Sequence, residues 1–310
     1  MTRFMIRRFL SLIPTIFLII TIAFIIVRSA PGGPFASEKN MAPEIIENLK
    51  KKYHMDESVV KQYFRYLGDV ALRADLGPST RFKDFTVNEI ISQALPTSML
   101  LGVMALSVSV FLGIAAGIIS ALKQNSWIDY LSMSLAVIGI SIPLFVIGPI
   151  LKLFLSLKWH LLPTSGWLGG RAGWVVIIMP VITLSLPYLA SIARLTRASV
   201  LEVLRADYIR TARSKGLSEM VVVLKHVLKG ALLPVVSFLG PAFAGIITGT
   251  VVVEQIFTIP GMGRPYIQGA INRDYGLIMG DVIVFSLILV LMNFLVDIFY
   301  GFLDPRISYK

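Results

Sequence analysis

Residues 9–27 read FLSLIPTIFLIITIAFIIV, nineteen residues without a charge. A helix of about 20 apolar residues spans the hydrocarbon core of a bilayer. The run is long for the apolar part of a signal peptide, and no clear small-residue cleavage site follows it. We therefore predict a retained transmembrane helix in this segment.

The rest of the chain has the same character. Of its 310 residues, 55% are hydrophobic and 15% are charged, and the mean hydropathy is +0.77. These values exceed those of soluble globular domains and indicate a membrane protein. The absence of cysteine excludes disulfides, thiolate metal sites and cysteine nucleophiles. A net charge of +11 would suggest nucleic acid as the partner of a soluble chain. Here the charges have first to be placed relative to the bilayer.

Five further apolar windows follow the first one, each bounded by charged or Gly/Pro-rich stretches. The sequence therefore predicts an all-α integral membrane protein with six transmembrane helices. The predicted spans are Phe9–Val27, Pro96–Leu122, Tyr130–Leu157, Trp174–Ala193, Leu232–Phe257 and Leu277–Leu303.

Lysine and arginine in the short connections predict the orientation, because cytoplasmic loops carry the excess of these residues. Fourteen fall on one side, in residues 1–8, 123–129, 194–231 and 304–310, against four on the other side. Both termini are therefore predicted to be cytoplasmic. The predicted organisation is a cytoplasmic N-terminus with helix 1 (1–27), an extracytoplasmic insertion (28–95), a transmembrane domain (96–303) and a cytoplasmic C-terminus (304–310).

The predicted insertion is polar, with ten basic and nine acidic residues between Arg28 and Ala94. Amphipathic patterns predict helices at Pro43–Leu49 and around Val59–Leu67, before a turn at Asp75–Pro78. We interpret the insertion as a structural plug over the outer mouth. The alternative is that it contacts a soluble partner or guides a ligand.

The predicted cytoplasmic connection 194–231 is longer than a turn requires. Its pattern predicts two helices, of which the first ends at Lys215-Gly216, a favourable C-terminal stop. The second begins near Ser218, whose hydroxyl can cap it, and continues into Leu233-Pro234. A basic amphipathic helix often lies on anionic lipid, and the residues alone leave that alternative open. The predicted apolar face of the first helix consists of Val200, Leu201, Leu204, Tyr208 and Ile209.

The run DYIRTARSKGLS at 207–218, followed by KHVL at 225–228 and ALLP at 231–234, resembles a known loop. It is similar to the coupling loop of binding-protein-dependent ABC importer permeases, specifically the peptide/nickel group. The general loop begins with Glu-Ala-Ala and places Gly four residues after the second Ala. Here Arg210-Thr211-Ala212 stands at the Glu-Ala-Ala position and Gly216 matches. The missing Glu and the late Leu233-Pro234 are departures that the peptide group itself shows.

Segments along nearly the whole chain resemble the first permease subunit of oligopeptide importers. They are Arg7-Arg8, Ala30–Pro34, Asp75–Ser79, Gly139–Pro143, Gly240-Pro241, Ile259–Gly263, Asn272–Tyr275 and Val296–Ile307.

The resemblance implies the type I ABC importer permease fold and a cargo of oligopeptides or dipeptides delivered by an extracytoplasmic binding protein. It also implies a second homologous permease and two P-loop ATPases, which bind ATP and Mg²⁺ and clasp the coupling loops. The chain itself is then no enzyme and binds no cofactor, metal or nucleic acid. In this loop Tyr208 and Ile209 are expected to be buried against an ATPase while arginines flank the contact. The coupling residues so implied are Tyr208, Ile209, Arg210, Thr211, Ala212, Arg213, Lys215, Gly216, Leu217, Leu233 and Pro234.

The sequence contains no G-x-x-x-x-G-K-[ST] motif, so a P-loop has to come from another chain. The alternative function is a self-sufficient ion-coupled transporter of small peptides, in which Asp297 or Glu254 couples protons. Among the charges within predicted spans, we expect Lys152 to snorkel outward and Glu254 and Asp281 to be solvated near the span ends. The spacing of Gly113 and Gly117, and of Gly245 and Gly249, permits close helix packing. No residue is assigned to the substrate pathway.

Overall fold

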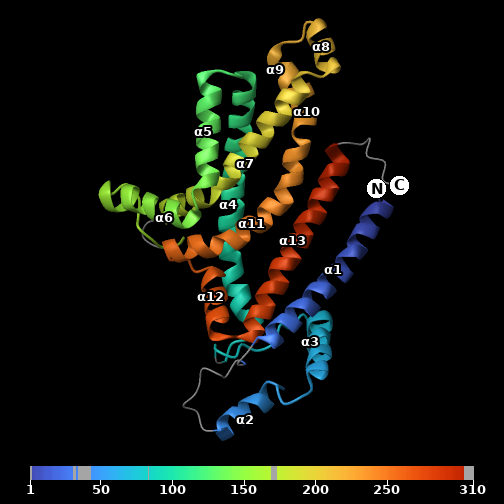
Figure 1. Ribbon diagram of the computed structural model, residues 1–310, viewed down its shortest axis with the longest axis vertical. Coiled ribbons are helices and arrows are strands. Elements are labelled where there is room, and N and C mark those ends of the chain that lie inside the picture. The colour runs from blue at the N-terminus through green and yellow to red at the C-terminus, as the bar shows by residue number, and fades with distance from the viewer. Residues whose placement is uncertain (1, 31–32, 34–42, 83, 169–172, 304–310) are drawn as a thin grey trace. The chain divides into compact units, whose positions relative to one another are not determined.

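The computed structural model describes residues 2–30, 33, 43–82, 84–168 and 173–303. Figure 1 shows a helical chain, and among the described residues one isolated bridge joins Pro78 and Thr86. The chain forms two compact units. The first comprises Met1–Ile6, Met99–Ile259 and Leu289–Lys310, and the second comprises Arg7–Ser98 and Pro260–Ile288.

Four helical segments are long and apolar enough to cross a membrane, and two bent helix pairs pass the same test together. The described part of the chain thus holds four to six candidate spans, in agreement with a multi-pass membrane protein. The single segments are Ile6–Ser29, Val87–Leu122, Gly173–Leu204 and Tyr275–Ile298, and the bent pairs are Trp127–Ser141 with Leu144–Lys158 and Glu219–Ala231 with Leu233–Ile247.

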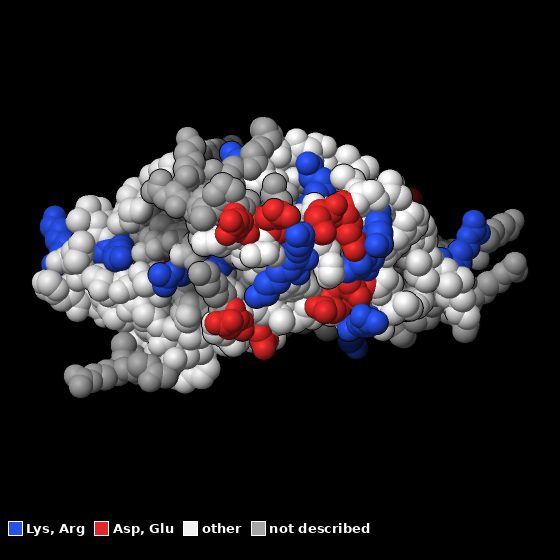
Figure 2. Space-filling model, turned by 90° about the horizontal axis from the view of Figure 1, so that it is seen from below, with Lys and Arg blue, Asp and Glu red and all other residues white. Residues whose placement is uncertain are grey.

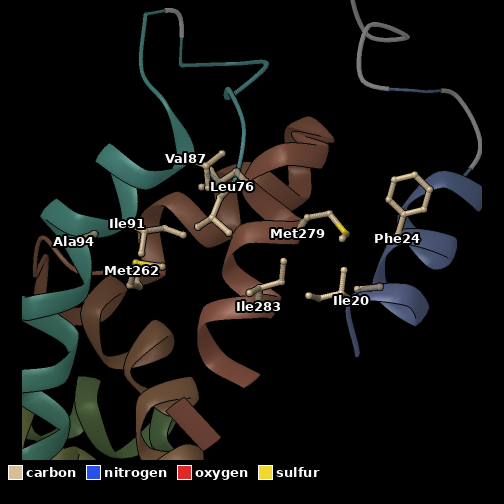
Figure 3. Close-up of a cluster of buried hydrophobic side chains, with 11 residues drawn as sticks. Ile20, Phe24, Leu76, Val87, Ile91, Ala94, Met262, Met279 and Ile283 are labelled. Atoms are coloured by element: carbon tan, nitrogen blue, oxygen red, sulfur yellow. The ribbon is translucent and has the colours of Figure 1, made fainter. Parts of the chain in front are cut away.

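The second unit contains two short amphipathic helices, and the second of them packs with several membrane helices around one apolar core. Figure 3 shows Ile20 of one helix and Ile283 of another turned toward each other, and Phe24 and Met279 belong to the same buried cluster. Tyr63, Tyr66, Leu67 and Val70 cover this core from the side. Both helices predicted between residues 43 and 67 are present. The elements are α1 (Thr2–Ser29), α2 (Pro43–Lys52), α3 (Val59–Arg73), the start of α4 (Val87–Leu122), α12 (Gly263–Asn272) and the start of α13 (Tyr275–Leu303).

Asp274 holds two distant segments of the second unit together. Its buried carboxylate accepts hydrogen bonds from the Ser79 hydroxyl and from the amides of Thr80 at 3.2 Å and Arg81 at 3.3 Å. It also accepts the Leu277 amide at 3.2 Å, in the first turn of α13. A side-chain acceptor at this position satisfies an amide that the helix itself leaves free.

The first unit is built around α7 (Ile178–Leu204). In the 18-residue apolar stretch of this span, 56% of the residues are buried, compared with 22% to 33% in the other three single spans. This makes α7 the central helix of its unit. It packs against α5, α6 and α11. The bounds are α5 (Trp127–Ser141), α6 (Leu144–Leu151), the π-helix η1 (Lys152–Lys158), the 3₁₀ helix η2 (Gly173–Ile177) and α11 (Leu233–Phe257).

The third predicted span is not one helix. The chain breaks at Ile142-Pro143, and the segments on either side are bent by 107°. Ile142 is extended, with φ −91° and ψ 122°, because the residue before a proline is disfavoured in the helical region. The fourth predicted span also differs, since α7 continues past Ala193 as far as Leu204.

The charges within the spans are placed otherwise than we expected. Lys152 does not extend to the surface, because its Nζ donates to the carbonyl oxygen of Ile256 at 3.2 Å. Glu254 and Asp281 are not solvated, with exposed fractions of 1% and 0%. Their helices α11 and α13 bury these positions within the protein. Neither carboxylate oxygen of Asp281 has a hydrogen-bond partner among the described residues.

The glycine pair at 113 and 117 does mark a close helix approach. A Cβ on Gly117 would lie 2.6 Å from the carbonyl oxygen of Ala193, and one on Gly113 would lie 2.9 Å from that of Leu189. Helices α4 and α7 therefore meet backbone to backbone here, as small residues allow in membranes.

We expect Gly117→Ala to lower the free energy of unfolding by about 1–3 kcal/mol, because the added methyl group forces α4 away from α7. Thermal unfolding of the purified protein measures the change. Gly68→Ala in α3 is the control, since nothing lies within 4 Å of the added Cβ there. Equal melting temperatures for both variants would contradict the close approach.

Candidate functional site

The connection after α7 begins with a sharp turn. The amides of Arg205 and Ala206 bond back three residues, to Glu202 at 3.2 Å and Val203 at 3.0 Å, and Ala206 is extended. A new short helix, α8 (Asp207–Ser214), then begins. The single helix that we predicted up to Lys215 is therefore two helices, because the extended Ala206 interrupts the helical hydrogen bonds.

One face of α8 is anchored to its own chain. Ile209 is fully buried and Ala212 is 5% exposed. The expectation that Ile209 is buried against another protein is therefore wrong, since its side chain already belongs to a core of the first unit. This core consists of Ala121, Val200, Ile209, Ala212, Val222, Val227 and Ala231.

The opposite face of α8 is open. Tyr208 is 51% exposed, although its hydroxyl oxygen lies 3.4 Å from the position that a Cβ would take on Gly230. Arg210, Thr211 and Lys215 are exposed as well. Arg210 has Asp207 at 3.8 Å, but both side chains are largely in solvent, so this pair contributes little to stability.

Gly216 follows the last turn of this helix, where we predicted its end, and its backbone is left-handed. Its φ is +77°, and nothing lies within 4 Å of the place where a Cβ would stand. The constraint at this position is therefore the backbone conformation and not the space available. The neighbouring amides of Lys215 and Gly216 close the turn on Thr211 at 3.1 Å and Arg213 at 2.9 Å.

An ion pair bridges the Gly216 turn. Arg213 donates from Nε and Nη2 to Oε1 of Glu219, at 2.9 Å and 2.6 Å. The bond joins α8 to the segment that follows, α9 (Glu219–Val221). Ser218 precedes α9 but makes no side-chain cap, so that expectation is wrong, and the Arg213–Glu219 pair is what links the two helices across the turn.

Beyond the turn, sequence reasoning missed two exposed apolar residues. Met220 is 74% exposed and Leu224 is 58% exposed, while Leu217, which we did predict, is 39% exposed. Their spacing of three and four residues is the helical signal that would have found them. We call Tyr208, Leu217, Met220 and Leu224 the apolar stripe. Exposed apolar side chains of this kind are suited to contact with a protein partner.

The predicted residues Leu233 and Pro234 do not belong to this surface. They begin α11, after the π-helix η3 (Val222–Val227), the short helix α10 (Leu228–Ala231) and a break at Leu232. The segments before and after this break are bent by 53°. Pro234 lies in the first turn of α11, where a proline is tolerated because the amide has no helical partner.

A buried charged network lies one turn from the anchor of α8. Arg197 of α7 donates from Nε and Nη2 to the two carboxylate oxygens of Asp129, both at 2.7 Å. The same carboxylate accepts the Ser120 hydroxyl at 2.5 Å and the Asn125 amide at 3.0 Å. The Asp129 side chain is 3% exposed. This network joins α4, α5 and α7 close to Val200, which itself packs with Ile209.

Two family models match the sequence that builds this arrangement. Residues 113–309 match the binding-protein-dependent transport system inner membrane component, and residues 1–101 match the N-terminal part of such membrane components. The chain belongs to this family. The first match contains α8, the Gly216 turn and the apolar stripe, so the candidate site lies within the part of the chain that matches the inner membrane component.

Relatives in this family align along their whole length. The oligopeptide transport system permease protein OppB of Haemophilus influenzae is 45% identical over 309 residues, covering 100% of both chains. OppB of Escherichia coli K12 is 46% identical over the same length. The dipeptide transport system permease protein DppB of Bacillus subtilis is 41% identical, covering 99% of this chain and 98% of the relative.

Solved transporters share the fold of this family. A chain of the MetNI methionine ABC transporter in an inward-facing conformation superposes with a TM-score of 0.58 at 18% identity, covering 70% of this chain and 97% of that chain. A chain of an amino acid ABC transporter crystallised with histidines gives 0.51 at 17% identity, over 68% and 93%. The chain is thus a multi-pass membrane component with an ABC importer fold.

Proposed function

We propose that this chain is the permease subunit of an ATP-driven importer that takes up oligopeptides or dipeptides from an extracytoplasmic binding protein. The observation that carries the proposal is the full-length identity of 45% to 46% with OppB proteins. A dipeptide permease is nearly as similar, at 41% identity, so the proposed cargo includes dipeptides as well as oligopeptides.

The proposed orientation follows the basic residues. The predicted cytoplasmic side, with both termini, has fourteen Lys and Arg in its short segments, which cytoplasmic loops favour. Counting each bent helix pair as one span gives the six spans of the type I importer permease. This proposal places α8 and the apolar stripe inside the cell and residues 28–95 outside it.

The apolar stripe is the proposed seat of an ATPase subunit. Its four side chains are exposed while Ile209 and Ala212 fix α8 to the first unit. When an ATPase subunit displaces a helix that is anchored in this way, the first unit moves with the helix. Such rigid-body movements can switch a transport pathway between inward and outward access. ATP and Mg²⁺ bind to the ATPase partners, and this chain forms the pathway together with a second, homologous permease.

We expect the tagged chain, purified from native membranes, to bring with it a second permease and two P-loop ATPases. Met220→Glu is expected to lose at least 90% of the ATPases and to keep the second permease, because a carboxylate then faces the seat. Leu72→Glu in α3 is the control, since Leu72 is 87% exposed in the other unit. ATPase recovery that is unchanged by Met220→Glu would contradict the seat, and purification of the wild-type chain without any ATPase would contradict the function.

A further inference from the structure

The second unit contains a cavity of about 700 Å³ that the proposed import cycle leaves without a role. Its walls come from the end of α1, from residues 52–55, from α3, from residues 75–80 and from the start of α13. Small-molecule sites have volumes of about 300–1,000 Å³, so a short peptide fits within it. The lining combines aromatic side chains with charged ones, among them Phe24, Tyr66, Tyr275, Arg28, Asp69 and Asp75.

Arg28 gives the cavity a fixed positive charge. Its guanidinium carbon lies 5.5 Å from the ring centroid of Phe24 and 5.5 Å from that of Tyr275. Both rings are buried, so they hold the guanidinium in place without neutralising it. Arg28 forms no ion pair within the part of the chain that the structure describes. A partly buried guanidinium in this state favours an incoming carboxylate, which it can bind with two hydrogen bonds.

The arginines of α3 that line the cavity are already paired. Arg65 donates to Glu57 at 2.6 Å, and Arg73 donates to Asp69 at 3.2 Å. Figure 2 shows the same balance on the outside, where Lys and Arg are interspersed with Asp and Glu on one face of the molecule. Arg28 is therefore the arginine of the cavity wall whose charge is left for a ligand.

A carboxylate supplies the opposite charge. Asp75 lines the cavity on the segment after α3, whereas Asp69 of α3, which also lines it, is already paired with Arg73. Asp75 is fixed by the Gly77 amide, which donates to it at 2.9 Å. A ligand that carries a carboxylate and an ammonium group, separated by a short chain, matches a wall with Arg28 on one element and Asp75 on another.

We propose that this cavity binds short peptides, with the C-terminal carboxylate on Arg28 and the N-terminal ammonium group toward Asp75. Apolar side chains of the peptide then contact Phe24, Tyr66 and Tyr275. The proposal rests on the proposed function, which supplies peptides as cargo. It assigns the second unit a binding role in addition to its packing role.

The test compares two probes on two proteins. The complete transporter without its binding protein, in phosphatidylcholine nanodiscs, is dialysed against radiolabelled trialanine or trialanine amide, which lacks the carboxylate. Wild-type protein is expected to bind the free acid at least tenfold more tightly than the amide. Arg28→Gln is expected to bind both probes equally, at the level of the amide, because only the acid interacts with the guanidinium.

Two further variants keep this result interpretable. Arg73→Gln removes another arginine of the cavity wall, one that is 76% exposed and already paired with Asp69, and it is expected to retain the preference for the acid. Arg28→Lys keeps the charge without the planar fork and is expected to retain part of that preference. This conservative variant separates a specific loss in Arg28→Gln from a failure to fold.

The proposal is overturned if wild-type protein binds acid and amide equally, or if the preference survives in Arg28→Gln. A lipid headgroup as the occupant would also overturn the proposal. In that case wild-type protein retains added phosphatidylglycerol, Arg28→Gln does not retain it, and trialanine does not displace it. Peptide uptake with the binding protein is measured in parallel. Peptide uptake without a binding preference for the acid would contradict the proposed cavity site alone. A lack of peptide uptake would contradict the proposed function.

Discussion

Gly216→Val is expected to reduce peptide uptake per ATP hydrolysed at least tenfold. Gly216 has a φ of +77°, and a β-branched residue in this conformation costs about 1–3 kcal/mol. The strain is relieved by changing the turn, which moves Glu219 away from Arg213 and shifts Leu217, Met220 and Leu224 relative to α8. Uptake and ATP hydrolysis measured in the same proteoliposomes give the ratio directly.

The control for this variant is Gly216→Asn. Asparagine tolerates the left-handed region far better than valine does, and space is not limiting because nothing lies within 4 Å of the added Cβ. We expect Gly216→Asn to retain more than half of the wild-type ratio. Normal coupling in Gly216→Val would show that the turn does not transmit the motion.

Asp129→Ala is expected to lower the free energy of unfolding by about 3–5 kcal/mol, because it leaves Arg197 without its carboxylate partner in a mostly buried network. The Ser120 hydroxyl and the Asn125 amide lose their acceptor in the same step. For a unit of this size we expect the melting temperature to fall by on the order of 10 °C. Thermal unfolding of the purified protein measures the fall.

The double variant Asp129→Leu/Arg197→Met separates packing from charge. It removes both ions while keeping apolar bulk, so we expect it to recover more than half of the stability that Asp129→Ala loses. A double variant as unstable as the single one would contradict this explanation, because the loss of stability would then not come from the unpaired charge of Arg197.

Hydropathy and turn chemistry predicted those parts of the fold that depend on local sequence. The apolar windows mark the membrane segments, and the amphipathic pattern around residues 43–67 marks α2 and α3. The left-handed Gly216 follows from its place after the last helical turn. A helix break at Pro143 can be predicted from the sequence. The angle of 107° cannot, because it depends on what α6 packs against.

Some of the errors concern contacts between residues that are distant in sequence. Asp129 and Arg197 are 68 positions apart, and no local pattern pairs them. Ile209 is an apolar residue of an amphipathic helix, as interface residues often are. Val200 and Val222 of its own chain nevertheless bury it. Glu254 and Asp281 lie near span ends, where solvation is the usual outcome, and only the packing of their helices shows that they are buried.

The central claim is that this chain imports peptides by means of ATP hydrolysed on partner subunits. The most direct measurement reconstitutes it in proteoliposomes with its second permease, its ATPases and its binding protein, and follows uptake of a labelled peptide. We predict that uptake requires ATP on the ATPase side and continues when the pH gradient is abolished. Uptake by the chain without any ATPase, driven by a pH gradient alone, would contradict the account and favour a proton-coupled transporter that uses Asp297 or Glu254.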